Sequence, residues 1–487
     1  MRLPRRELLQ WGALSAAGLA AAGCRSFEQQ LTHPDLDPDA LHAVPPNHSP
    51  AVRILYRAGF GPRPGEAAVV EKMGIPAYVD EQLYPEKIEE SAPATWRVRA
   101  LGDSLNSDTG LLFDQDDHRL INTLRQAAIL RAVYSRRQLL ERMVEFWGDH
   151  FNIYAFKGQG PQLKVVDDGA TIRQHALGRF RDLLGASAHS AAMLGYLDNT
   201  SNRKGVPNEN YARELMELHT LGVDGGYTQA DVKEVARCLT GWNSERHWHR
   251  GKFHFDPDLH DDGPKRVLGH TLPAGGGVED GERVLDILAI HPSTARHLAR
   301  KLSIYFLGWQ DPVWVERLAA VYLRTGGDIR ETLRPLLTSP ELLSSAPILK
   351  RPFDYMVSAL RTLNVDTDGD LPLQKHLEKM GQPLFAWPMP DGFPQGAGAW
   401  TGTLIARWNF AMALAGNTIN NTQVDWDELS GAAKGAGLSA HDGLLELVFS
   451  APAAEPTLER LRRLAADHSD PPEFSAVLLM SPEFQWR

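Results

Sequence analysis

The chain has 487 residues, of which 43% are hydrophobic and 23% are charged, and its net charge is −10. A chain of this length can bury a large core in one to three domains. Because the net charge is negative and no basic run occurs beyond the first residues, nucleic acid is not an expected partner. The two cysteines, Cys24 and Cys238, are too few for a disulfide framework.

Residues 1–24 are typical of an export signal. Two adjacent arginines at positions 5 and 6 resemble a twin-arginine signal, and the apolar run 11–22 is too short to span a membrane. The sequence AAGC, which ends at Cys24, resembles a lipoprotein cleavage box that would make Cys24 the lipidated N-terminus. The alternative is an ordinary cleaved signal with an incidental cysteine. We expect export to the periplasm or cell surface, with membrane contact only through a lipid anchor.

The rest of the chain divides into a tether and a body. Residues 25–50 are rich in Pro, His and Asp and predict an irregular, flexible tether. Residues 51–487 predict a single large domain that is mainly all-α, with a small β hairpin near residues 252–268, where Phe253 and Phe255 alternate with polar neighbours. No phosphate-binding glycine loop, GxSxG turn or CxxCH sequence is present. The periodicity predicts these helices, among others: 117–134, 137–152, 171–184, 292–307, 312–325 and 329–337.

The segment Asn208–Trp242 predicts two helices around a glycine turn. The side chain of Asn208 can cap the first helix, and Gly222 can close it. Thr228 begins the second helix, with Asp231 three residues later as a variant of the capping box.

One side of the first of these helices is acidic. Helical geometry places Asn210, Arg213, Glu214 and Glu217 together, and His219 at the edge of the apolar side. If this side lines a cleft, the repulsion between Glu214 and Glu217 should raise one carboxyl pKa, which suits acid–base chemistry or cation binding. The alternative is a solvated face in which Arg213 pairs with Glu217, and His219 is a packed core residue.

Two further residues are candidates for the same cleft. His150 follows an apolar stripe at helical spacing, so it is either a functional residue or a packed core histidine. Asp198 precedes the polar loop that leads into the acidic helix, and its alternative role is a turn hydrogen bond.

The segment Glu245–His270 is dense in His and Asp and could bind a divalent metal. Its spacing matches neither HExxH nor an EF-hand loop, and the alternative is a solvated loop. We take His260 and Asp261 as the best candidate ligands here, with His150 as a further one, and Lys265 as a possible partner of Asp261.

The longest predicted loop, 381–402, is aromatic. Trp387 and Trp400 could stack on sugar rings or cover a cleft, and Asp391 could reach a site. The alternative is that the aromatic side chains only fill the space between helices.

Several ordered segments resemble the bacterial family called domain of unknown function 1800. The similarity covers nearly all of the chain after about residue 50, and it implies no particular reaction. The segments are RAGFGP (Arg57–Pro62), FWGDHF (Phe146–Phe151), YLDN (Tyr196–Asn199), NENYARELMELHTLG (Asn208–Gly222), FHFDPDLHDDGPKRVLG (Phe253–Gly269), HPSTARHLARKL (His291–Leu302), WPMPDGFP (Trp387–Pro394) and SPEFQWR (Ser481–Arg487).

These observations favour an exported cell-envelope hydrolase with an acidic cleft that acts on polysaccharide or a related substrate. The expected catalytic residues are Glu214, Glu217, Asp198 and His219, and the expected substrate-binding residues are Asn210, Arg213, Trp387, Asp391 and Trp400. One alternative is a non-catalytic envelope protein that assembles with a co-exported partner; the resemblance implies a partner related to alkaline phosphatases and sulfatases. A third possibility is metal storage or sensing by the His/Asp segment.

Overall fold

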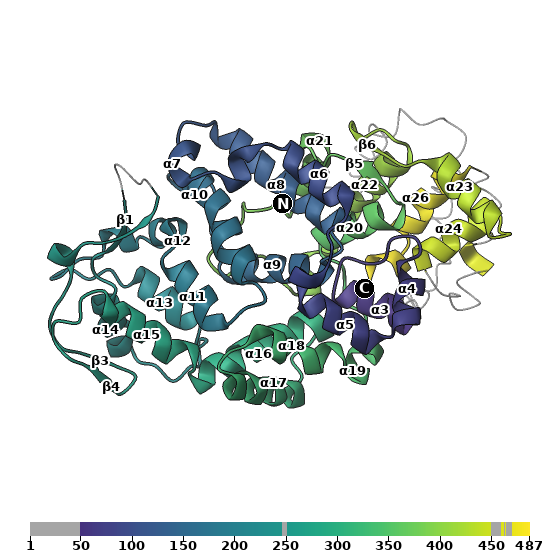
Figure 1. Cartoon of the computed structure of the whole chain (residues 1–487). Helices are drawn as coiled ribbons and strands as arrows, with labels where there is room; N and C mark the ends of the chain where they lie inside the picture. Colours follow the sequence, from purple (N-terminus) through teal and green to yellow (C-terminus); the bar gives the residue numbers. More distant parts are fainter. Residues whose placement is uncertain (1–48, 246–250, 450–458, 462, 464–469) are drawn as a thin grey trace, which may run out of the picture.

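The computed structural model describes residues 49–245, 251–449, 459–461, 463 and 470–487. In this part of the chain the fold is mainly all-α, and the strands form only two-stranded sheets (Figure 1). The predicted signal, Cys24 and nearly all of the tether lie outside the described residues. None of the described helices combines the length and the apolar character that a membrane span requires.

In the first half of the chain the predicted helix 117–134 is confirmed, and the predicted helix 137–152 is two residues too long at its C-terminal end. The predicted helix 171–184 is wrong, because Arg179 pairs with Asp328 in an isolated bridge that interrupts it. The helices are α3 (Pro50–Arg57), α4 (Glu66–Met73), α5 (Ile75–Leu83), α6 (Ala92–Ala100), α7 (Thr109–Leu112), α8 (Asp117–Tyr134), α9 (Gln138–His150), α10 (Gly160–Val166), the π-helical turn Asp167–Arg173, α11 (Phe180–Ala188), α12 (Ala191–Tyr196), α13 (Asn210–Glu217) and α14 (Gln229–Cys238).

In the second half, the three predicted helices 292–307, 312–325 and 329–337 are confirmed to the residue. Local signals define them, since Asp311 and Asp328 accept backbone N–H groups as N-caps and Gly308 ends the first helix with a positive φ. The helices are α15 (Glu279–Ala289), α16 (Pro292–Leu307), α17 (Pro312–Thr325), α18 (Ile329–Leu337), α19 (Pro340–Ser344), α20 (Pro352–Thr362), α21 (Leu371–Lys379), α22 (Leu404–Ala415), α23 (Trp426–Gly435), α24 (Ala440–Phe449) and α26 (Pro471–Met480).

The strands form three short antiparallel pairs. The predicted strand around Phe253 is confirmed, but it pairs with a strand that begins earlier than the predicted hairpin, and a second hairpin follows it. The pairs are β1 (Trp242–Ser244) with β2 (Phe253–Phe255), β3 (Lys265–Val267) with β4 (His270–Leu272), and β5 (Asp366–Thr367) with β6 (Thr422–Gln423).

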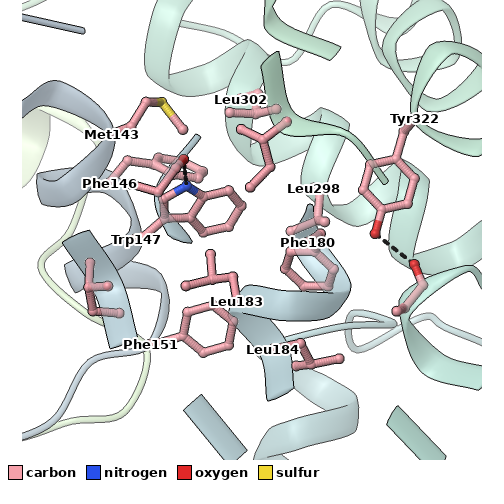
Figure 2. Packing of buried hydrophobic residues seen from close by; sticks show 14 of the residues in the cluster. Met143, Phe146, Trp147, Phe151, Phe180, Leu183, Leu184, Leu298, Leu302 and Tyr322 are labelled. Carbon is pink, nitrogen blue, oxygen red and sulfur yellow. Dashed lines mark hydrogen bonds between the residues drawn. The ribbon is translucent and has the colours of Figure 1, made fainter. Parts of the chain in front are cut away.

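The first hydrophobic core is centred on α9, which packs between α11 and α16 (Figure 2). Trp147 is 1% exposed, and its indole N–H donates to the carbonyl oxygen of Ala176 at 2.9 Å. The predicted apolar stripe of α9 is confirmed, because Met143, Phe146 and His150 are also buried. The end of this buried stripe therefore carries His150 into the core.

A second core is built from α8, α20, α22 and α26. Buried ion pairs connect it to the first core. Arg142 of α9 contacts the carboxylate of Asp354 in α20, and Arg351 donates to Asp149 at 2.6 Å. Arg351 also pairs with Glu145. These contacts hold the C-terminal end of α9 in place beside the candidate site.

Candidate functional site

The acidic helix α13 presents its glutamates on the side opposite to the core. The side chain of Asn208 accepts the backbone N–H of Asn210 at 3.0 Å, but the N-cap of α13 is Glu209 and not Asn208 as predicted. Tyr211 and Leu215 are at most 1% exposed, whereas Glu214 and Glu217 are half-buried. After the glycine turn, α14 begins with the predicted capping box between Thr228 and Asp231.

The environment of Glu214 favours its protonated form. Burial raises the pKa of Glu214, and the negative charges of Glu217 and Asp391 raise it further, while Arg213 opposes them. Burial raises the pKa of Tyr227, and the negative charge of Glu217, which accepts a hydrogen bond from the Tyr227 hydroxyl, raises it further. The predicted interaction between the two helix carboxylates is therefore present, and a third carboxylate joins them.

The third carboxylate comes from the loop 381–402, which is tied to two helices. The side-chain amide of Asn152, just after α9, donates to the carbonyl oxygen of Met389 at 2.6 Å. The hydroxyl of Tyr196, at the end of α12, donates to the carbonyl oxygen of Pro388 at 2.7 Å. These two anchors place Asp391 within electrostatic reach of Glu214. We call Glu214, Glu217 and Asp391 the carboxylate cluster.

The turn that carries Asp391 touches the backbone of α9. Gly392 has a φ of +76°, and a Cβ at this position would lie 2.2 Å from the carbonyl oxygen of Asp149. Only glycine fits such a close approach with this backbone conformation. The indole N–H of Trp387 donates to Asp391 Oδ1 at 3.1 Å, so this tryptophan orients the carboxylate.

A lysine of α16 faces the same region. Burial lowers the pKa of Lys301 to about 8, and the negative charges of Asp149 and Asp391 oppose that shift. In the described part of the chain the Lys301 ammonium forms no hydrogen bond or ion pair. Burial lowers the pKa of His150, His219 and His297, and the positive charge of Lys301 lowers it further.

Three histidine rings lie close together: His150 and His219 are buried, and His297 is partly buried. The ring centroid of His150 lies 6.0 Å from that of His219 and 6.2 Å from that of His297. His150 Nε2 is 3.0 Å from the carbonyl oxygen of His219, and His297 Nε2 is 3.0 Å from that of Leu218. Burial lowers the pKa of His219 to about 3 and that of His297 to about 4, so both rings are neutral near pH 7.

Four expected site residues have local structural partners. Asp198 pairs with Lys157 at 2.8 Å, and its positive φ of 60° marks a turn. The side-chain amide of Asn210 donates to the carbonyl oxygen of Leu197 at 3.1 Å. Arg213 pairs with Glu209 at 3.1 Å and not with Glu217. The indole of Trp400, 5% exposed, donates to the carbonyl oxygen of Pro394.

The expected metal ligands also have protein partners. The ring nitrogens of His260 lie 2.8 Å from the carbonyl oxygen of Thr240 and 3.2 Å from Asp280. Both carboxylate oxygens of Asp261 accept from Arg237, at 2.8 and 3.0 Å. The ammonium of Lys265 pairs with Asp280 at 2.6 Å, and not with the carboxylate of Asp261. The described residues contain no group of three or more His, Cys, Asp or Glu arranged to hold a metal ion.

No pattern in the sequence points to Asp149, Tyr196 or Lys301 as residues of this site. The three residues belong to three different helices, α9, α12 and α16, so their positions become related only in the folded chain. Each of them nevertheless lies within one of the segments FWGDHF, YLDN and HPSTARHLARKL. The resemblance of these segments to the family was therefore the signal that could have identified the three residues.

Comparison with known proteins gives one match. The model of a family described as "Protein of unknown function (DUF1800)" matches residues 53–486. No curated protein and no solved structure matches the chain.

Proposed function

This chain belongs to the DUF1800 family, and we propose that it is an exported cell-envelope hydrolase whose carboxylate cluster cleaves glycosidic bonds in a polysaccharide. The observation that carries this proposal is that the loop anchored to Asn152 and Tyr196 brings Asp391 near the helix face of Glu214 and Glu217. In this arrangement burial and the two neighbouring negative charges raise the pKa of Glu214. Acid–base cleavage of a glycosidic bond needs one carboxyl group that stays protonated and another that stays ionised.

In this proposal Glu214 is the general acid that protonates the leaving oxygen. Asp391 is the exposed carboxylate supplied by a different segment, and it activates the attacking water. Glu217 does not contact the substrate, and its charge adds to the effect of burial in raising the pKa of Glu214. Lys301 faces Asp391 and balances part of the negative charge of the cluster.

The test is the pair of variants Glu214→Gln and Glu209→Gln. Glutamine at 214 keeps the size of the side chain but is not a useful acid, so we expect turnover of a cell-envelope polysaccharide to fall by about 100-fold to 10,000-fold. Glu209 is on the same segment and pairs with Arg213, so it is a matched control that should keep its activity. Equal activities of the two variants would refute the role of Glu214, and melting temperatures would show whether both are folded.

A second candidate function is binding to a co-exported protein related to alkaline phosphatases and sulfatases, without catalysis. Its support is an apolar strip on α22, where Leu404, Ile405 and Met412 are 42%, 60% and 39% exposed. Exposed apolar side chains that recur along one helix are found at protein contacts. Under this candidate, Ile405→Asp abolishes co-purification with such a partner and Glu214→Gln leaves it unchanged.

A further inference from the structure

Two neighbouring cavities lie between α10, α12 and the β1–β2 hairpin. Their volumes are about 340 and 350 Å³, and ligand sites typically occupy about 300–1,000 Å³. Residues Leu163, Ala191, Ala192 and Gly251 line both of them, so the two cavities lie side by side. We use the term trough for these two cavities together.

Tyr196 connects the trough to the carboxylate cluster. It lines the second cavity, and its hydroxyl binds the loop that carries Asp391. Burial, together with the charges of Asp391 and Glu214, raises the pKa of Tyr196 to about 12. Tyr196 is thus shared by the second cavity and by the anchor of the loop that carries Asp391.

The lining of the trough carries little unbalanced charge. Each charged side chain in it has an oppositely charged or ionisable partner, so an ionic ligand finds no free counter-charge. The pairs are Lys157 with Asp198, Lys252 with Asp108, Asp167 with Lys164, His189 with Glu282 and Glu245 with His254.

The remaining lining suits a sugar chain. Aromatic side chains offer flat apolar faces to the carbon-bound hydrogens of a sugar ring, and hydroxyl and amide groups can bind its hydroxyls. The trough contains both kinds of group along its length: Tyr154, Tyr196 and Phe253, together with Gln159, Thr200, Ser107, Thr109 and Ser190.

We propose that the trough binds a segment of a neutral polysaccharide and presents an internal glycosidic bond to Glu214. This inference rests on the proposed function and adds to it the charge class of the substrate and the site where the chain lies.

Gly195 is a suitable position for a substitution that blocks the trough. It lies in α12 and lines the second cavity, and a Cβ added there meets no atom within 4 Å. Gly195→Phe therefore fills the trough without a backbone clash. Gly431, in α23 outside the trough, also has no atom within 4 Å of an added Cβ, so Gly431→Phe is the matched control.

The experiment is native electrophoresis in gels that each contain one soluble polymer. The neutral polymers are hydroxyethylcellulose, glycol chitin, mannan and dextran; polygalacturonate is the anionic polymer and casein the polypeptide. We expect at least one neutral polymer to slow the wild type, Glu214→Gln and Gly431→Phe, and Gly195→Phe to migrate as in a plain gel.

The inference is overturned if no neutral polymer slows the protein, or if Gly195→Phe is slowed as much as the wild type. It is also overturned if only polygalacturonate or casein gives a retardation that depends on Gly195. Failure of the proposed function is distinguishable from this. In that case Glu214→Gln cleaves the retarding polymer as fast as the wild type, while binding still depends on Gly195.

Discussion

The backbone of Gly392 lies against the carbonyl oxygen of Asp149. A Cβ added to Gly392 would be only 2.2 Å from this oxygen. This contact joins the end of α9 to the loop 381–402. It also determines where the neighbouring Asp391 lies. The position of one carboxylate of the cluster thus depends on a glycine.

Gly392→Ala should displace the turn from α9. Its positive φ alone costs about 1–3 kcal/mol for a residue with a side chain, and the Cβ contact prevents the native approach. We expect a lower melting temperature and a loss of activity larger than the fraction unfolded explains. Gly396→Ala is the control in the same loop, because its Cβ would meet no atom within 4 Å. If both variants behave like the wild type, the contact does not position Asp391.

Glu217→Gln should lower the pKa of Glu214. Removing the charge of Glu217 removes one of the causes that hold the Glu214 pKa above 4.5. A carbon-13 NMR titration of labelled glutamate carboxyl groups measures this without a substrate, and the signal missing in Glu214→Gln identifies Glu214. In a pH–activity profile the alkaline limb, where the acid loses its proton, should move to lower pH. An unchanged Glu214 titration would show that the two carboxylates do not interact.

His297→Gln should make stability less dependent on pH. The folded-state pKa of His297 is about 4, below its ordinary value of 6.5. The unfolded chain therefore binds this proton more readily, and stability falls as pH decreases from about 6.5 toward 4, by at most about 1.4 kcal/mol per pH unit for one histidine. Glutamine can still donate to the carbonyl oxygen of Leu218. Urea unfolding at pH 7, 6 and 5 should give a shallower slope for the variant, and equal slopes would contradict the prediction.

Lys265→Met should destabilise the β3–β4 region strongly. Lys265 and Asp280 are both buried and pair at 2.6 Å, so the variant leaves a buried carboxylate without its ammonium partner. Removing one partner of a buried ion pair lowers the free energy of unfolding by about 3–5 kcal/mol. The double variant Lys265→Met/Asp280→Leu should recover much of this free energy of unfolding in urea titrations. If the double variant is as unstable as the single one, the pair is not the cause.

The sequence predicted elements wherever the signals were local. The capping box of Thr228 and Asp231 and the helix Pro292–Leu307 are confirmed, because caps, proline and apolar periodicity all act within a few residues. The helix expected at 171–184 failed because Arg179 pairs with Asp328, far along the chain. No local pattern signals such a bridge.

In the candidate site, too, local interactions could be predicted from the sequence and long-range ones could not. The interaction of Glu214 with Glu217 could be predicted, since residues three apart on a helix are neighbours. The approach of Asp391 and Lys301 could not, because it depends on how a loop and α16 pack against α13 and α9. The partner of Lys265 was misassigned for the same reason: Asp280, distant in sequence, is closer to the ammonium than the carboxylate of Asp261.

The contact between Arg142 and Asp354 bears on how the molecule unfolds. Each residue belongs to a helix of a different core, and both are almost fully buried. Melting either core alone would leave an uncompensated ion inside the other, at a cost of several kcal/mol. The two halves should therefore denature as one cooperative unit, with a single calorimetric peak whose van't Hoff enthalpy equals its measured enthalpy.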